Sequence, residues 1–110
     1  MASRSGVLVV LVTCPTPASA RRIARALLSK RLVACVNILP GVDSWFWWKG
    51  TIDHSKEALL ILKTVADKFE AVRRSVLAQH PYQVPEVLAV ASSHGYGPYL
   101  EWVRACILTK

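Results

Sequence analysis

The side chains of this sequence best suited to chemistry are potential metal ligands. His80 lies in the segment H-P-Y-Q-V-P-E (80–86), which two prolines stiffen, and Glu86 follows it in the same segment. With Cys14, these residues supply an imidazole, a carboxylate and a thiol, and soft thiol and imidazole ligands favour copper or zinc. Their spacing matches no standard local metal motif, so a metal site would require the fold to bring them together.

Each of these residues also has a purely structural interpretation. For His80, a loop histidine that is hydrogen-bonded to the backbone is favoured over a ligand. Cys14 is consistent with a small buried hydrophobic side chain. Lys63 follows an aliphatic run, so it is expected either to face a cleft or to be an ordinary lysine at a strand end.

Motifs of the common enzyme classes are missing from the sequence. There is no G-x-S-x-G nucleophile motif and no phosphate-binding G-x-x-x-x-G-K-[ST] loop. Gly95-Tyr96-Gly97 lacks the third glycine of a dinucleotide fingerprint, and no two cysteines have C-x-x-C spacing. We therefore predict a protein that is not an enzyme and that requires no cofactor.

The composition of the 110 residues predicts one domain, spanning 1–110. No apolar run approaches the ~20 residues of a transmembrane helix. The three cysteines are widely spaced and odd in number, which is typical of a reducing compartment, so a cytoplasmic protein is expected. A chain trimmed of a targeting leader would look the same.

The net charge of +7 is concentrated before Asp43, notably at Arg21, Arg22 and Arg25. A basic face indicates an anionic partner such as nucleic acid, or a solvated helix face that keeps the protein soluble. An RNA-recognition module would also need stacking aromatics in an R/K-G-F/Y-G/A-F-V-x-F/Y strand, and none is present. We therefore predict no nucleic-acid partner and keep the RNA-binding module as a less favoured alternative.

The longest feature is a predicted β-hairpin over 34–64, with its turn at Asp53-His54-Ser55. Extended from Ala34 to Ile52, the first arm would span ~60 Å. A compact chain of this length is only about 35 Å across. The arm must therefore bend, for which Pro40-Gly41 is suited, or its far end must leave the body of the domain.

Aromatic residues in this arm predict an interface. A two-stranded ribbon is unstable alone in water, and its apolar faces and free edges favour a partner. The simplest partner is another copy of the chain; the alternative is a hairpin folded back over its own core. The residues predicted to lie between subunits are Trp45, Phe46, Trp47, Trp48 and Ile52.

The remaining elements predict an α+β fold. An aliphatic strand over 6–13 precedes a helix that Thr16 caps and Pro17 begins, and Asp67 with Glu70 is typical of the cap of a second helix. A short strand over 87–91 and a helix from Pro98 complete the order strand, helix, strand, strand, helix, strand, helix. This is the ferredoxin-like split β-α-β sandwich with a long protruding hairpin and an extra C-terminal helix. Its helices would cover one face of the sheet and leave the other bare.

Five segments of the chain form a distinctive series: A-C-V-N-I-L-P-G (34–41), W-W-K-G-T-I (47–52), L-L-I-L-K-T (59–64), H-P-Y-Q-V-P-E (80–86) and Y-L-E-W (99–102). In this order they resemble the CutA divalent-cation tolerance proteins. The likeness covers about residues 6–108, and the V-T-C-P opening (12–15) is similar to animal members.

The resemblance implies a ferredoxin-like subunit, related in shape to PII signalling proteins, that forms a homotrimer through its hairpins. It implies a link to copper and other divalent cations and no enzymatic activity. For animal members it also implies an acetylcholinesterase-related assembly and anchoring partner.

Carried over residue by residue, the bacterial copper ligands match incompletely. The cysteine position is Val12 here, with Cys14 two residues later, and the histidine pair reads Gln79-His80. A weak copper or divalent-cation site at His80, Cys14 and Glu86 is therefore the metal prediction. The alternative is a PII-like sensor of small molecules, with an inter-subunit cleft at Trp48, Lys63 and Tyr82.

Overall fold

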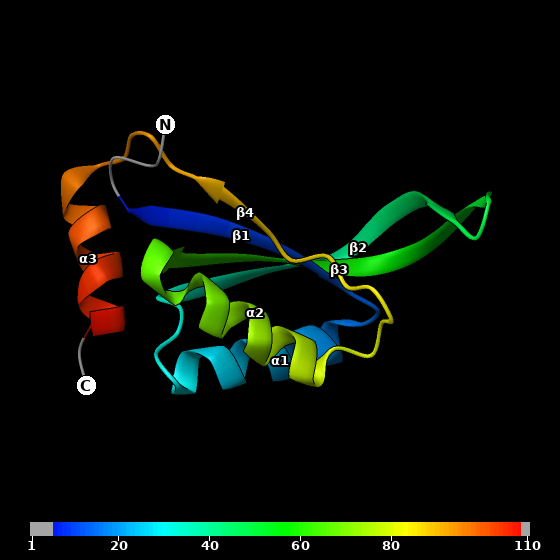
Figure 1. Ribbon diagram of the computed structural model, residues 1–110, viewed down its shortest axis with the longest axis horizontal. Coiled ribbons are helices and arrows are strands. Elements are labelled where there is room, and N and C mark those ends of the chain that lie inside the picture. The colour runs from blue at the N-terminus through cyan, green and yellow to red at the C-terminus, as the bar shows by residue number, and fades with distance from the viewer. Residues whose placement is uncertain (1–5, 109–110) are drawn as a thin grey trace.

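A computed structural model describes residues 6–108. Strands and helices form a mixed α+β arrangement, which confirms the predicted class (Figure 1). Their order along the chain is β1 (Val7–Cys14), α1 (Pro17–Ser29), β2 (Cys35–Trp48), β3 (Thr51–Val65), the 3-10 turn η1 (Ala66–Lys68), α2 (Phe69–Gln79), β4 (Leu88–Ala91) and α3 (Gly97–Leu108).

The four strands form one antiparallel sheet in the order β2-β3-β1-β4. Successive side chains of a strand point to opposite faces, and the even-numbered residues of β1 and β3 point to the core. Val10 and Val12 of β1 and Leu60 and Leu62 of β3 are fully buried there with apolar residues of α1 and α2, including Ile23. These two helices lie side by side on that face (Figure 1).

The helix α3 packs against the opposite face of the sheet, which differs from the prediction that all helices share one face. Its Val103 and Ile107 form a second apolar cluster with Val7 of β1 and Val65 of β3. Val7 and Val65 are paired across the strands and, by alternation, face away from α1 and α2. The helix covers only the end of this face near the start of β1 (Figure 1).

The starts of the two long helices differ in their capping. Thr16 caps α1 as predicted: its hydroxyl accepts a hydrogen bond from the backbone N–H of Ser19 at 3.0 Å, and Pro17 is the first helical residue. The predicted Asp67 cap of α2 is wrong. Asp67 lies inside η1, which already turns the chain into the helix, and Lys68 precedes α2 without any side-chain cap bond.

The hairpin of β2 and β3 bends and also leaves the body of the domain. The pairing shifts between Leu39 and Val42, so Pro40-Gly41 forms a bulge in which Gly41 has φ +71°, a conformation that glycine adopts without strain. Beyond this bulge the ribbon projects past the ends of α1 and α2 (Figure 1). The domain is consequently elongated, with extents of 43 × 30 × 22 Å.

The hairpin turns at Lys49-Gly50, so the predicted turn at Asp53-His54-Ser55 is wrong. Trp48 pairs with Thr51, which leaves a two-residue loop with φ +52° at Lys49 and +83° at Gly50. Such loops have positive φ at both positions, and K-G supplies the glycine. Asp53 instead continues the β3 ladder opposite Phe46.

We predict that Gly50→Ala lowers the free energy of unfolding by about 1–2 kcal/mol, because an added Cβ is strained at this positive φ. No heavy atom lies within 4 Å of that Cβ, so the cost is conformational rather than steric. Gly97→Ala is the matched control, since its Cβ also meets nothing within 4 Å and its φ is not in the left-handed region. Urea denaturation at a fixed chain concentration measures both; equal losses would contradict the turn assignment.

Candidate functional site

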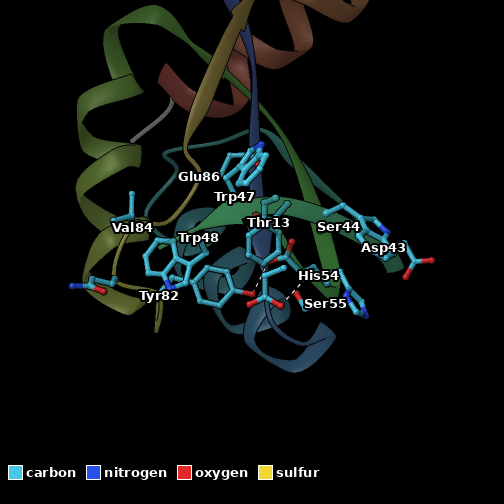
Figure 2. A pocket seen from close by; sticks show the side chains of 15 residues that line it. Thr13, Asp43, Ser44, Trp47, Trp48, His54, Ser55, Tyr82, Val84 and Glu86 are labelled. Carbon is cyan, nitrogen blue, oxygen red and sulfur yellow. Dashed lines mark hydrogen bonds between the residues drawn. The ribbon is translucent and has the colours of Figure 1, made fainter. Parts of the chain in front are cut away.

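A cavity of about 950 Å³ opens at the root of the projecting hairpin. Its walls come from the end of β1, both strands of the hairpin and the connector between α2 and β4. In the view of Figure 2, Trp48 and Tyr82 lie on one side, and Asp43, His54 and Ser55 lie on the other. Segments far apart in the sequence therefore meet here.

Strand alternation divides the aromatic residues of the hairpin between its two faces. Phe46 is paired with Asp53, and alternation places both on the same face as Ser55 and Glu57. Trp45 lies on the other face, where its ring stacks on that of His54 with centroids 4.4 Å apart. Residues of both faces line the cavity: Ser55 and Glu57 come from one face, and Trp45 and His54 from the other.

The central contact of the cavity joins Tyr82 to Glu57. The hydroxyl of Tyr82 donates a hydrogen bond of 2.6 Å to Oε2 of Glu57, a residue that is only 8% exposed. Burial, followed by this hydrogen bond, raises the pKa of Tyr82 well above its ordinary value. The tyrosine thus remains a neutral donor that satisfies one oxygen of a buried carboxylate.

His80 uses both ring nitrogens for structural hydrogen bonds. Nδ1 accepts a bond of 3.2 Å from the backbone N–H of Tyr82, so Nε2 carries the proton and donates to the carbonyl oxygen of Thr13 at 2.6 Å. The ring also packs on that of Tyr82, with centroids 4.7 Å apart. A metal ion would have to displace one of these bonds.

Cys14 is fully buried in the core at the end of β1. Burial raises the pKa of its thiol to about 11, and the nearby carboxylate of Glu57 contributes to that rise. Since metals bind the thiolate, this environment disfavours a ligand role. The burial of Cys14 agrees with its structural interpretation as a small buried hydrophobic side chain.

The predicted metal residues do not form a metal-binding arrangement. No group of three or more histidine, cysteine, aspartate or glutamate side chains suited to one ion occurs within residues 6–108. Glu86 lines the cavity, but neither His80 nor Cys14 does. The implied copper or divalent cation therefore does not fit this set of residues in the conformation described.

Within one chain, the residues predicted to line an inter-subunit cleft lie in two places. Trp48 and Tyr82 both line the cavity, whereas Lys63 does not. The Lys63 ammonium donates hydrogen bonds to Oδ1 of Asn37 at 2.5 Å and to Sγ of Cys35 at 3.7 Å.

Glu57 is the important residue that the sequence analysis did not single out. It stands before the apolar run A-L-L-I-L of β3, and its side chain is on the face opposite the core residue Ala58. An acid beside an uninterrupted apolar run is the signal that could have found it, because burying a carboxylate requires a partner.

The cavity is acidic although the chain is basic. Its lining includes four carboxylates, and no lysine or arginine occurs among the described residues that line it. Since the whole chain has a net charge of +7 and only seven acids, more than half of its acids gather here. The four are Asp43, Asp53, Glu57 and Glu86.

The sheet, its helices and the projecting hairpin define a small mixed α+β domain with an acidic cavity and no recognisable metal centre in the described part. Residues 8–106 match the family model described as "CutA1 divalent ion tolerance protein". The chain belongs to this family, which confirms the resemblance.

Bacterial and animal relatives agree with this assignment. The divalent-cation tolerance protein CutA of Thermus thermophilus is 45% identical over 96 residues, which cover 87% of this chain and 93% of that protein. Protein CutA of Homo sapiens is 44% identical over 98 residues, which cover 89% of this chain and 55% of the human protein. The chain thus spans about half the length of the human relative.

Solved structures share the whole architecture. The structure of divalent cation tolerance protein from T. thermophilus superposes with a TM-score of 0.88 at 43% identity, covering 90% of this chain and 96% of the other. CutA1 from Oryza sativa superposes with a TM-score of 0.90 at 39% identity, covering 94% and 95%. In the present chain, no helix of residues 6–108 has the length and hydrophobicity needed to span a membrane.

We predict that Tyr82→Phe lowers the free energy of unfolding by about 1–3 kcal/mol, because it leaves a buried carboxylate oxygen of Glu57 without its donor. Tyr96→Phe is the matched control, since Tyr96 is 76% exposed. Chemical denaturation at pH 7 compares the two variants. Equal stability of Tyr82→Phe and the wild type would contradict the role given to this hydrogen bond.

The pH dependence of stability distinguishes two carboxylates. Desolvation, then repulsion from Glu57, raises the pKa of Glu86, so the folded state favours the protonated form. The contribution of Glu86 to stability is therefore present below its ordinary pKa and is lost as the pH rises through the raised pKa. We therefore expect Glu86→Gln to be more stable than the wild type at pH 7 and no more stable well below pH 4.5, the ordinary value.

Glu70→Gln is the control of opposite sign. The hydrogen bond from Arg73 lowers the pKa of Glu70, so the ionised form stabilises the fold above the ordinary pKa, and this is lost as the pH falls through the lowered value. Its substitution should slightly destabilise the protein at pH 7. Thermal melts of both variants between pH 3 and 8 measure the difference, and curves of the same sign would refute the assignment.

Proposed function

We propose that this chain is a ferredoxin-like subunit of a homotrimer that serves divalent-cation tolerance by binding rather than by catalysis. The strand order β2-β3-β1-β4 supports the ferredoxin-like description, because each β-α-β crossover places a helix on the same face. Membership of the divalent ion tolerance family supports the role. The homotrimer rests on the surfaces that one copy of the chain leaves uncovered.

The single observation that carries the proposal is the exposure of the outer face of the hairpin. Trp45, Trp47 and Ile52 are 67%, 72% and 62% exposed, and the pairing of Trp47 with Ile52 places all three on one face. A ribbon with apolar side chains in water and two free edges is typical of a surface that another chain covers. Phe46 and Trp48, also predicted at the interface, are only about 40% exposed, and all four aromatic residues of the hairpin contribute to the lining of the cavity.

The sheet itself supports association between copies. Beyond α3, the face opposite the core presents Leu39, Leu88 and Val90, which are 42%, 56% and 52% exposed. β2 and β4 are the two edge strands, so each leaves one row of backbone groups unpaired within the described domain. Apolar side chains beside open edges favour sheet-to-sheet contact between subunits.

The proposal assigns no metal chemistry to His80, Cys14 and Glu86, because their geometry does not fit a shared ion. Cation tolerance would then depend on the assembly or on another ligand of the cavity. The acetylcholinesterase-related partner implied by animal relatives is retained as a proposal for the whole protein, with the exposed hairpin as a suitable surface. A small-molecule sensor is the second candidate function, and the cavity beside Trp48 and Tyr82 favours it.

We expect the purified protein to have a mass in solution of about three times the 12.2 kDa of one chain. The double variant Trp45→Ser/Trp47→Ser should lower that mass on dilution, because it removes the most exposed apolar rings of the hairpin. Leu77→Ser is the matched control on α2, where Leu77 is 42% exposed. Light scattering coupled to size exclusion measures all three proteins.

A monomeric wild type at high micromolar concentration would refute the trimer. An unchanged mass for the double variant would refute the role of the hairpin while leaving assembly through the sheet face possible. Copper titration of wild type and His80→Ala by calorimetry tests the metal site predicted from the sequence; because both ring nitrogens of His80 are hydrogen-bonded to the backbone, we expect identical isotherms.

A further inference from the structure

The cavity at the root of the hairpin combines two features that together recognise organic cations. Its carboxylates are not balanced by a lysine or arginine among the described lining residues, which include His54, and the same walls carry indole, phenyl and phenol rings. Carboxylates attract positive charge, and aromatic faces attract cations through their quadrupoles. The net charge of +7 makes this concentration of acids unlike the rest of the chain.

Most of the negative charge in the cavity has no counter-charge. Asp43 is neutralised by Lys56 at 3.1 Å on the exposed side. The other three acids make no ion pair within the described residues. The amide of His54 donates to Oδ1 of Asp53, and only Oε2 of Glu57 has a hydrogen-bond donor.

Glu57 presents one oxygen that a ligand in the cavity can reach. The residue is more than nine-tenths buried, yet its Oε1 has no hydrogen-bond partner among residues 6–108, and the side chain lines the cavity. Among the described residues, Oγ of Ser75 is the one fully buried side-chain polar atom without a partner, so Oε1 of Glu57 keeps access to the cavity and can accept a hydrogen bond or a cation there. The cavity of about 950 Å³ is ample for a small organic molecule.

The aromatic side chains supply the remaining walls. Phe46 and Trp48 share the face of the hairpin that carries Glu57, and Tyr82 approaches from the connector. Phe46 and Trp48 are each about 40% exposed, so part of each ring is accessible to a ligand. Figure 2 shows Trp48 and Tyr82 on the same side of the cavity.

We propose that this cavity binds a small organic cation with an alkylated ammonium head, whose charge lies against Glu57 and whose methyl groups lie against Trp48, Phe46 and Tyr82. A bare divalent metal fits less well, because the described residues contain no convergent set of three ligands. Anions such as nucleotides are repelled by the unbalanced carboxylates.

The test uses tetramethylammonium chloride as the probe and tert-butanol as the neutral molecule of similar shape. Calorimetric titration at constant ionic strength, balanced with sodium chloride, compares the two on the full chain. We expect saturable binding of tetramethylammonium and at least tenfold weaker binding of tert-butanol. Equal affinities would overturn the proposal, because an apolar cavity without charge selection would explain the binding. Displacement of the probe by one equivalent of copper would overturn the assignment of the ligand as an organic cation rather than a metal ion.

Two variants identify the residues involved. Glu57→Gln keeps the size of the side chain and an acceptor for Tyr82 but removes the charge, and Trp48→Leu removes an aromatic wall. Each is expected to weaken tetramethylammonium binding roughly tenfold, the scale of a desolvated cation–π contact or ion pair. Glu101→Gln and Trp102→Leu are the matched controls on α3, outside the cavity, and should bind as the wild type does.

Circular dichroism of every variant establishes that it is folded, and Glu86→Gln replaces Glu57→Gln if the latter is not. Unchanged binding in both the charge and the aromatic variant would refute the site. The inference does not depend on the homotrimer: the solution mass of each sample is measured in parallel, so loss of assembly and loss of binding are separate results.

Discussion

A two-stranded ribbon cannot bury both of its faces against a domain this small, and the rest of the structure depends on that constraint. β2 and β3 contain 14 and 15 residues, while the shorter extents of the domain are 30 and 22 Å. The bulge at Pro40-Gly41 bends the ribbon, and the tight loop at Lys49-Gly50 closes it without splaying the strands. Beyond the helices, the ribbon exposes aromatic side chains, and the acidic cavity lies where the ribbon leaves the body of the domain.

The connector between α2 and β4 fixes the ribbon to the body. The ring of His80 bonds to the carbonyl of Thr13 at the end of β1, and the hydroxyl of Tyr82 bonds to Glu57 of β3. Two adjacent side chains of a proline-stiffened segment thereby hold two strands at the point where the hairpin departs. His80, which looks like a metal ligand in the sequence, is committed to this structural role, whereas Cys14 is buried in the core at the end of β1.

Much of the fold was predictable because it depends on local patterns. Aliphatic runs, the Thr16-Pro17 helix start and the overlong arm predicted the α+β order and a projecting hairpin. The turn was misplaced because Asp53-His54-Ser55 has turn-forming side chains, whereas the backbone requirement for positive φ at Lys49-Gly50 decided the closure. The face of α3 and the buried Glu57 were missed because they depend on contacts between distant segments. The cavity was foreseen only through Trp48 and Tyr82, since charge balance in space cannot be read from the order of residues.

The fluorescence of the hairpin tryptophans tests the account most directly. In a Trp102→Phe variant, the remaining indoles are Trp45, Trp47 and Trp48, all in β2. If other copies cover the ribbon, the indole emission at high protein concentration lies at a shorter wavelength than that of free tryptophan, and acrylamide quenches it poorly. Dilution then moves the emission toward that of indole in water. Emission typical of fully hydrated indole at every concentration would contradict the claim that the ribbon is covered.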